Sequence, residues 1–115
     1  MSDAPVLGPV NRVADLAAAS DFEKKHTPQI DIDEVDGAYV VTVTVGAEVP
    51  HPNQPDHYIT WIELLAGEAA IARFDLSPIA TTPTVSVVVN ADPGTVLTAI
   101  EHCNLHGLWA AEVTL

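Results

Sequence analysis

Five histidines and a single cysteine are the side chains of this 115-residue chain that could bind a transition metal. Cys103 and His106 lie in the stretch EHCNLHGLW, where the C-x-x-H spacing lets a thiolate and an imidazole reach one ion from one loop. Gly107 permits a tight return of the chain. A thiolate combined with several imidazoles favours a transition metal over magnesium or calcium. The same spacing also fits a buried structural cysteine beside a turn, so both readings stay open.

The other histidines differ in their surroundings. His51 and His57 flank the segment PNQPD, whose two prolines stiffen the loop and so reduce the entropy lost on metal binding. A proline-rich turn with two polar surface residues is the alternative. His26 follows a pair of lysines in EKKHTP. His102 precedes Cys103 on a predicted strand, where adjacent side chains point to opposite faces, so we expect it to be exposed and not a ligand.

Charge and cysteine content exclude several classes of protein. Four basic residues against sixteen acidic ones give a net charge of −12, which argues against nucleic acid and against anionic membranes. A single cysteine excludes an intramolecular disulfide and a cysteine-only metal site. The N-terminus lacks the pattern of a secretory signal, and no apolar stretch is long enough to span a bilayer. We therefore expect a cytoplasmic protein.

Residues 29–115 have the pattern of successive short strands. QIDIDEV alternates apolar and acidic residues with a period of two, which is typical of a half-buried strand. Asp36–Gly37 is a hairpin turn signal, and the β-branched stretch AYVVTVTVG follows it. Such patterns predict strands over residues 29–35, 38–46, 58–67, 68–76, 84–90, 95–103 and 108–115.

About seven strands with almost no helix predict an all-β protein with an immunoglobulin-like antiparallel β-sandwich. We expect one domain over residues 1–115, with an N-terminal segment over 1–25 and the sandwich over 26–115. Residues 1–10 are expected to be irregular. Residues 11–22 predict a short helix, because Val13, Leu16 and Ala17 share one face.

Three stretches, KHTP, HPNQPDHYITWIEL and CNLHGLW…EVTL, resemble in order and spacing the superoxide reductases, the iron domain shared by neelaredoxin and desulfoferrodoxin. The resemblance extends from about Asp21 to the C-terminus. The four-cysteine rubredoxin-like domain of desulfoferrodoxin has no counterpart in this sequence. The match is therefore to the single-iron, neelaredoxin-like class.

This resemblance implies one mononuclear iron per chain, cycling between Fe²⁺ and Fe³⁺, with four equatorial histidines and an axial thiolate. It implies one-electron reduction of superoxide to hydrogen peroxide, with a rubredoxin-like protein or another small donor returning the electron. It also suggests a homo-oligomer, specifically a tetramer. Carried over position by position, the implied ligands are His26, His51, His57, His106 and Cys103.

The resemblance further implies a catalytic role for Lys25, which matches the family lysine before the first histidine ligand. A cation there attracts superoxide, and with a screening length of about 8 Å it can outweigh distant carboxylates. The family usually reads Glu-Lys-His, with the Glu able to close the sixth position of ferric iron. Here Lys24 occupies the Glu position and Glu23 lies one residue further back. We expect this carboxylate cap to be missing and water or hydroxide to take its place.

Three alternatives differ in what they require of these residues. A blue-copper-like electron carrier needs only two histidines and usually adds an axial Met after the Cys, whereas the only Met is Met1. Structural zinc takes four ligands, and five are implied here. A binding-only immunoglobulin-like module predicts that replacing Cys103 affects packing alone.

Overall fold

The computed structural model describes residues 9–115, so the irregular structure expected for residues 1–10 falls almost entirely outside the described residues. None of the helices in this range is long and apolar enough to cross a membrane. The short helices are the 3₁₀ helix η1 (Leu16–Ala18) and α1 (Asp21–His26). The strands are β1 (Val10–Arg12), β2 (Pro28–Val35), β3 (Ala38–Val45), β4 (Ile59–Ala66), β5 (Ala69–Asp75), β6 (Thr84–Val89), β7 (Val96–Cys103) and β8 (Gly107–Thr114).

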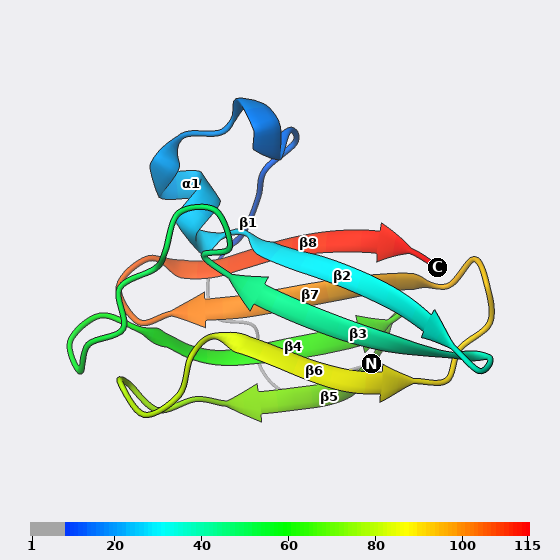
Figure 1. The fold of residues 1–115 in the computed structure, drawn as a ribbon. Coiled ribbons are helices and arrows are strands. Elements are labelled where there is room, and N and C mark those ends of the chain that lie inside the picture. The colour runs from blue at the N-terminus through cyan, green and yellow to red at the C-terminus, as the bar shows by residue number, and fades with distance from the viewer. Residues whose placement is uncertain (1–8) are drawn as a thin grey trace.

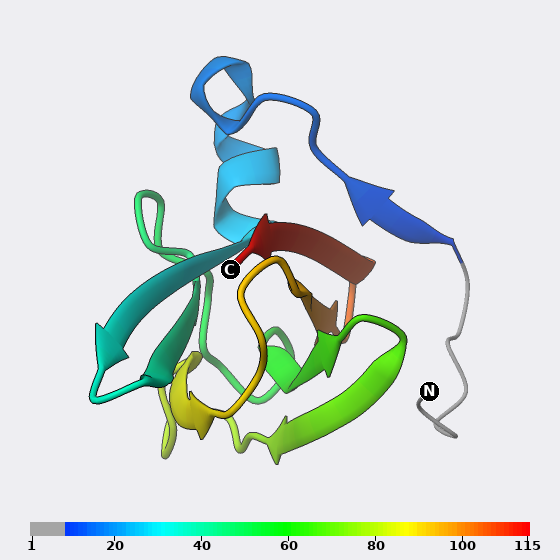
Figure 2. The ribbon, with the colours of Figure 1, turned by 90° about the vertical axis from the view of Figure 1, so that its right-hand side faces the viewer.

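The strands form two layers, which confirms the predicted β-sandwich (Figure 1). One sheet has the order β1-β8-β7-β4-β5 and the other the order β2-β3-β6. All pairings are antiparallel except that of β1 with β8, which is parallel. Figure 2 shows β1 lying along β8 at the margin of the larger sheet. The seven predicted strands are present, and β1 is an additional one.

The core lies between the sheets because the strands alternate as their sequences predict. Tyr39, Val41, Val43 and Val45 on β3 are buried, and the residues between them are only partly covered. This period of two places every second side chain of β3 against the opposite sheet. Burial of such β-branched side chains supplies the main stabilisation of the sandwich.

Strand β7 continues this inward row to the metal-binding candidate Cys103. Leu97, Ala99 and Cys103 are fully buried in the main core cluster. Ile100 packs instead in a second cluster, with Trp61 on the outer face of the larger sheet. The strand that builds the core thus also fixes the direction of the thiol.

The helix predicted over residues 11–22 is wrong for most of its length. Residues 10–12 form β1, whose register pairs Asn11 with Trp109, and the side chain of Asn11 donates to the carbonyl of Leu108. Tertiary pairing with β8 here overrides local helix propensity. The α-helix starts later, because Ser20 and Glu23 form a capping box that defines its first turn.

Three connections meet at one end of the sandwich (Figure 1). They are the junction of α1 with β2, the loop from β3 to β4, and the turn from β7 to β8. In the loop from β3 to β4, Gly46 has a φ of +82° and its backbone passes close to His51. A Cβ on Gly46 would lie 2.6 Å from the backbone nitrogen of His51. The sharp bend at Gly46 therefore fixes the position of the His51 backbone.

Gly46→Ala is predicted to destabilise the fold more than Gly37→Ala. Both glycines have nearly the same positive φ, +82° and +81°, but a Cβ on Gly37 would meet nothing within 4 Å. The left-handed conformation costs either variant about 1–2 kcal/mol. The backbone collision adds about 1–3 kcal/mol at Gly46. Urea unfolding of the two variants measures the difference, and equal losses would contradict this account.

Candidate metal centre

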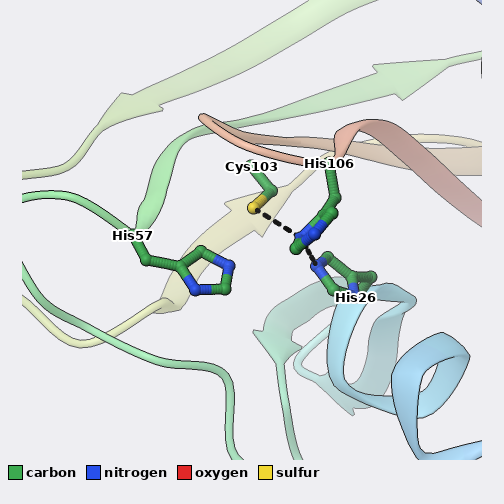
Figure 3. Close-up of side chains that lie close together, drawn as sticks. All are labelled: His26, His57, Cys103 and His106. Atoms are coloured by element: carbon green, nitrogen blue, oxygen red, sulfur yellow. Dashed lines mark hydrogen bonds between the residues drawn. The ribbon is translucent and has the colours of Figure 1, made fainter.

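Four side chains from the three connections converge at the end of the sandwich (Figure 3). The metal-binding atoms of His26, His57, Cys103 and His106 all lie within 4.8 Å of one another. Nε2 of His26 is 3.1 Å from Nδ1 of His106, and Sγ of Cys103 is 3.8 Å from the same nitrogen. This convergence joins α1, the β3–β4 loop and the β7–β8 turn at one point.

His51 belongs to the same cluster of rings. Its centroid lies 4.8 Å from the ring centroids of both His26 and His57. Nε2 of His51 and Nε2 of His57 are buried and have no hydrogen-bond partner among residues 9–115. Buried imidazole nitrogens without partners are costly unless something binds them. The donor set therefore fits a transition metal held by imidazoles and a thiolate.

Backbone carbonyls determine which nitrogen of two rings faces the cluster. Nδ1 of His26 donates to the carbonyl of Phe22 at 2.7 Å, and Nδ1 of His51 donates to the carbonyl of Pro52 at 2.7 Å. A carbonyl only accepts, so in the neutral ring the lone pair is on Nε2. Metal-binding histidines are commonly oriented in this way.

Burial keeps these imidazoles neutral. It lowers the pKa of His26 and of His57, and it lowers the pKa of His51 to about 4. The neighbouring rings act in the same direction on all three. Neutral imidazole is the form that binds metal, so these rings are ready to coordinate at physiological pH.

Cys103, like His26, is fully buried. Burial raises the pKa of its thiol, while hydrogen bonds from the backbone amides of Leu105 and His106 act in the opposite direction. The amides favour a thiolate, but burial outweighs them in the metal-free chain. A bound cation would displace the proton, because metal and proton compete for the same sulfur lone pair.

Two aromatic side chains cover one side of the cluster. Phe22 lies 4.6 Å from His26 and 4.9 Å from His106, measured between ring centroids. Trp109 stacks on His26 at 5.1 Å and donates from Nε1 to the carbonyl of His106 at 3.1 Å. Both rings restrict the motion of the histidines that they touch. Phe22 was not singled out by its sequence pattern.

Two asparagines hold the loops that carry the histidines. Asn53 donates from Nδ2 to the Thr81 carbonyl at 2.8 Å and accepts from the Ile79 amide at 2.9 Å. Asn104 bonds in a similar way to the residues on either side of His57. Sequence reasoning missed these two roles, although both residues lie inside the quoted motifs HPN and CNLH.

The three charged residues before His26 have different positions. The carboxylate of Glu23 accepts hydrogen bonds from the Ser20 amide at 3.1 Å and from its hydroxyl at 3.2 Å. Lys24 forms an ion pair with Glu48 at 3.8 Å. Lys25 forms no ion pair with any residue in the range 9–115, and its charge lowers the pKa of both His26 and His57. Of the three, Lys25 thus acts electrostatically on the cluster.

His102 lies outside the cluster. It stacks on Trp61 at 5.8 Å, and its Nδ1 is 2.7 Å from the hydroxyl oxygen of Thr60. The alternation of faces along β7 separates it from Cys103, as the strand argument predicts. It is half-buried, however, so the expected exposure was wrong, because Trp61 and Thr60 cover it.

Glu101 is a buried acid two residues before Cys103 on β7. It is completely inaccessible to solvent, and neither of its oxygens has a partner at hydrogen-bond geometry within residues 9–115. Burial raises the pKa of Glu101 to about 9, with only the Cys103 amide acting in the opposite direction. We expect Glu101 to be protonated at neutral pH.

These features define a β-sandwich with a histidine and cysteine metal centre at one end. Residues 18–112 match the family model for desulfoferrodoxin, and the chain belongs to that family. It is 36% identical to a putative superoxide reductase of Archaeoglobus fulgidus over 121 residues, with 88% of this chain and 97% of that protein covered. It is 37% identical to the superoxide reductase of Pyrococcus abyssi over 103 residues, covering 80% of this chain and 88% of that one.

Solved structures agree with this assignment. The superoxide reductase from Nanoarchaeum equitans superposes with a TM-score of 0.78 at 31% identity, covering 93% of this chain and all of that one. A neelaredoxin from Archaeoglobus fulgidus in the reduced form gives a TM-score of 0.74 at 32% identity, with 85% and 94% covered.

Glu101→Gln is predicted to stabilise the protein increasingly as the pH rises. The pKa of Glu101 is higher in the folded than in the unfolded chain. Its contribution to the free energy of unfolding is therefore most favourable below about pH 4.5 and is lost as the pH rises from about 4.5 to about 9. A glutamine does not titrate and loses no stability in this range. Its advantage in the free energy of unfolding grows by up to about 1.4 kcal/mol per pH unit within this window. Urea unfolding of both proteins from pH 5 to pH 8 measures it, and parallel pH profiles would contradict the prediction.

Proposed function

We propose that the protein is a superoxide reductase with a mononuclear non-haem iron held by His26, His51, His57, His106 and Cys103. The observation that carries the proposal is the convergence of a buried thiol with imidazole nitrogens within 4.8 Å, in a chain of the desulfoferrodoxin family. When bound, the iron supplies one electron, and this electron with two protons converts superoxide to hydrogen peroxide. An external donor must then return one electron per cycle.

The ligand set favours this function over the blue-copper alternative. A blue-copper site uses two histidines and one cysteine. Here the donor atoms of three histidines converge with the Cys103 thiol, and the His51 ring adjoins two of these histidines. Neighbouring ring centroids of the four histidines are 4.8–5.1 Å apart. Structural zinc would likewise leave one donor unused.

The chain contributes a neutral, preorganised set of donors. Burial holds His26, His51 and His57 in the form that binds metal, and carbonyl contacts turn Nε2 of His26 and His51 toward the cluster. The amides of Leu105 and His106 support negative charge on sulfur. Less energy is therefore spent on ordering the ligands when the ion binds.

Lys25 is proposed to attract the anionic substrate. The protein carries a net charge of −12, so its overall field opposes superoxide. The charge of Lys25 reaches both His26 and His57 and is not paired within residues 9–115. Lys24 is less suited to this role, because Glu48 lies 3.8 Å from it.

We also propose that Glu23 does not cap the metal. Its carboxylate is occupied by the amide and hydroxyl of Ser20, and the amide of Glu23 in turn bonds to the Ser20 hydroxyl at 3.2 Å. Reaching the cluster would break this capping box at the start of α1. A rubredoxin-like donor and a homo-oligomer remain predictions from the resemblance, and a cytoplasmic location remains a prediction from the sequence pattern.

Cys103→Ser is predicted to abolish the visible absorption of the oxidised, iron-loaded protein. That absorption arises from charge transfer between sulfur and ferric iron, which a serine cannot supply. His102→Ala is the matched control, because it alters the adjacent side chain on the opposite face of β7 and should retain the absorption. Iron content measured with the spectra separates loss of the thiolate from loss of the metal. A band that survives in the iron-loaded serine variant would contradict the assignment.

Lys25→Ala is predicted to lower the second-order rate constant for superoxide by about 10-fold at low ionic strength. Lys24→Ala removes the same formal charge from the same helix but should have a smaller effect, because Glu48 already neutralises it. Pulse radiolysis at several salt concentrations measures both rates. The difference between variants should shrink as salt screens the charges. Equal effects of the two substitutions would argue against a specific role for Lys25.

A further inference from the structure

Asn104 connects two of the segments that carry the proposed ligands. It lies between Cys103 and His106 in the β7–β8 turn. Its side chain donates from Nδ2 to the carbonyl of Asp56 at 2.9 Å and accepts at Oδ1 from the amide of Tyr58 at 2.9 Å. Its backbone amide adds a bond to the Tyr58 carbonyl at 3.2 Å. Three hydrogen bonds from one residue therefore hold both neighbours of His57.

This arrangement matters more for His57 than for His26 or His51. The last two rings are oriented by a hydrogen bond from Nδ1 to a carbonyl of their own segment. His57 is held through backbone groups of its own loop. Its amide and carbonyl pair with the backbone of Gln54 at 3.0 Å, and the side chain of Asn104 bonds to the backbone of the residues on either side of His57. A shift of this loop relative to Cys103 would break the bonds to Asn104.

We infer that Asn104 is a positioning residue that sets the distance of His57 from the Cys103–His106 turn, and so completes the metal site. This inference rests on the proposed function, because it assumes that His57 is a ligand. Asn104 itself is exposed and its hydrogen bonds go to backbone groups of Asp56 and Tyr58, so replacing it opens no cavity in the core. The effect of its loss should therefore fall on metal retention more than on folding.

The test measures release of iron from the loaded protein to excess ferrozine under reducing conditions. Asn104→Ala is expected to release Fe²⁺ about 10-fold faster than the wild type or more, since supporting residues of this kind contribute about 10-fold to 100-fold in metal affinity. Thr95→Ala is the matched control. It removes a side-chain hydrogen bond of a surface loop, to the carbonyl of Asp92 at 2.7 Å, in the β6–β7 connection next to the start of β7. Cys103 lies at the end of that strand, so this variant should release iron at the wild-type rate.

A double-mutant cycle separates positioning of His57 from general loosening of the loop. If Asn104 acts through His57, Asn104→Ala should accelerate release little further in a His57→Ala background. Additive effects in the cycle, or release from Asn104→Ala at the rate of Thr95→Ala, would overturn the inference. Thermal melting of each loaded variant shows which of them are folded.

A second variant keeps the test decisive if Asn104→Ala does not fold. Asn104→Asp keeps an acceptor for the Tyr58 amide and loses the donor to the Asp56 carbonyl. Faster release than from the wild type supports the inference, and release at the wild-type rate overturns it. If the wild-type protein holds no iron, the proposed function fails first. If it holds iron and Asn104 has no effect, only the positioning role fails.

Discussion

The structure depends on bringing several electron-pair donors to one point at the end of the sandwich. Imidazole nitrogens and a sulfur atom within 4.8 Å of one another present lone pairs that repel, unless a proton or a cation lies between them. Burial disfavours protonation of His26, His51 and His57, since it lowers the pKa of each ring. A metal cation would resolve this conflict. It would join three segments distant in sequence through one ion, and metal binding would then be part of the stability of the fold.

The β-sandwich makes this convergence possible by fixing the direction of each segment. Cys103 ends the row of inward-facing residues on β7, so the packing that buries Leu97 and Ala99 also aims the thiol. The capping box at Ser20 sets the first turn of α1, and the helix ends at His26. The bend at Gly46 fixes the start of the loop with His51. The geometry of the site therefore follows from ordinary strand, helix and turn preferences.

Local patterns predicted most of the fold. The strands were placed within one or two residues because alternation of apolar and polar side chains directly reflects a sheet with one buried face. Strand β1 could not be found in this way, since its three residues are held by parallel pairing with β8. The predicted N-terminal helix was misplaced because helix formers with Val13, Leu16 and Ala17 on one face suggested a helix over residues 11–22, whereas the capping box of Ser20 and Glu23 marks the real start.

The site was only partly predictable from residue types. Spacing alone left His51, His57 and Cys103 open between ligand and ordinary roles, and the resemblance to a family joined them into one set. Neither residue spacing nor the family resemblance predicted contacts between residues far apart in the sequence. The alternation of faces along β7 predicts that Glu101 points inward. Its burial without a hydrogen-bond partner among residues 9–115 depends on the opposing sheet, which the sequence does not place. Asn104 bonds to residues 46 and 48 positions earlier, which no local pattern indicates.

Iron K-edge X-ray absorption of the loaded protein tests the central claim most directly. We expect one iron per chain whose first shell contains one sulfur scatterer and four imidazole nitrogens. The sulfur contribution should disappear in the Cys103→Ser protein while the imidazole signal persists. An iron shell without sulfur, or with only two imidazoles, would contradict the assignment of Cys103 and the four histidines to a single metal centre.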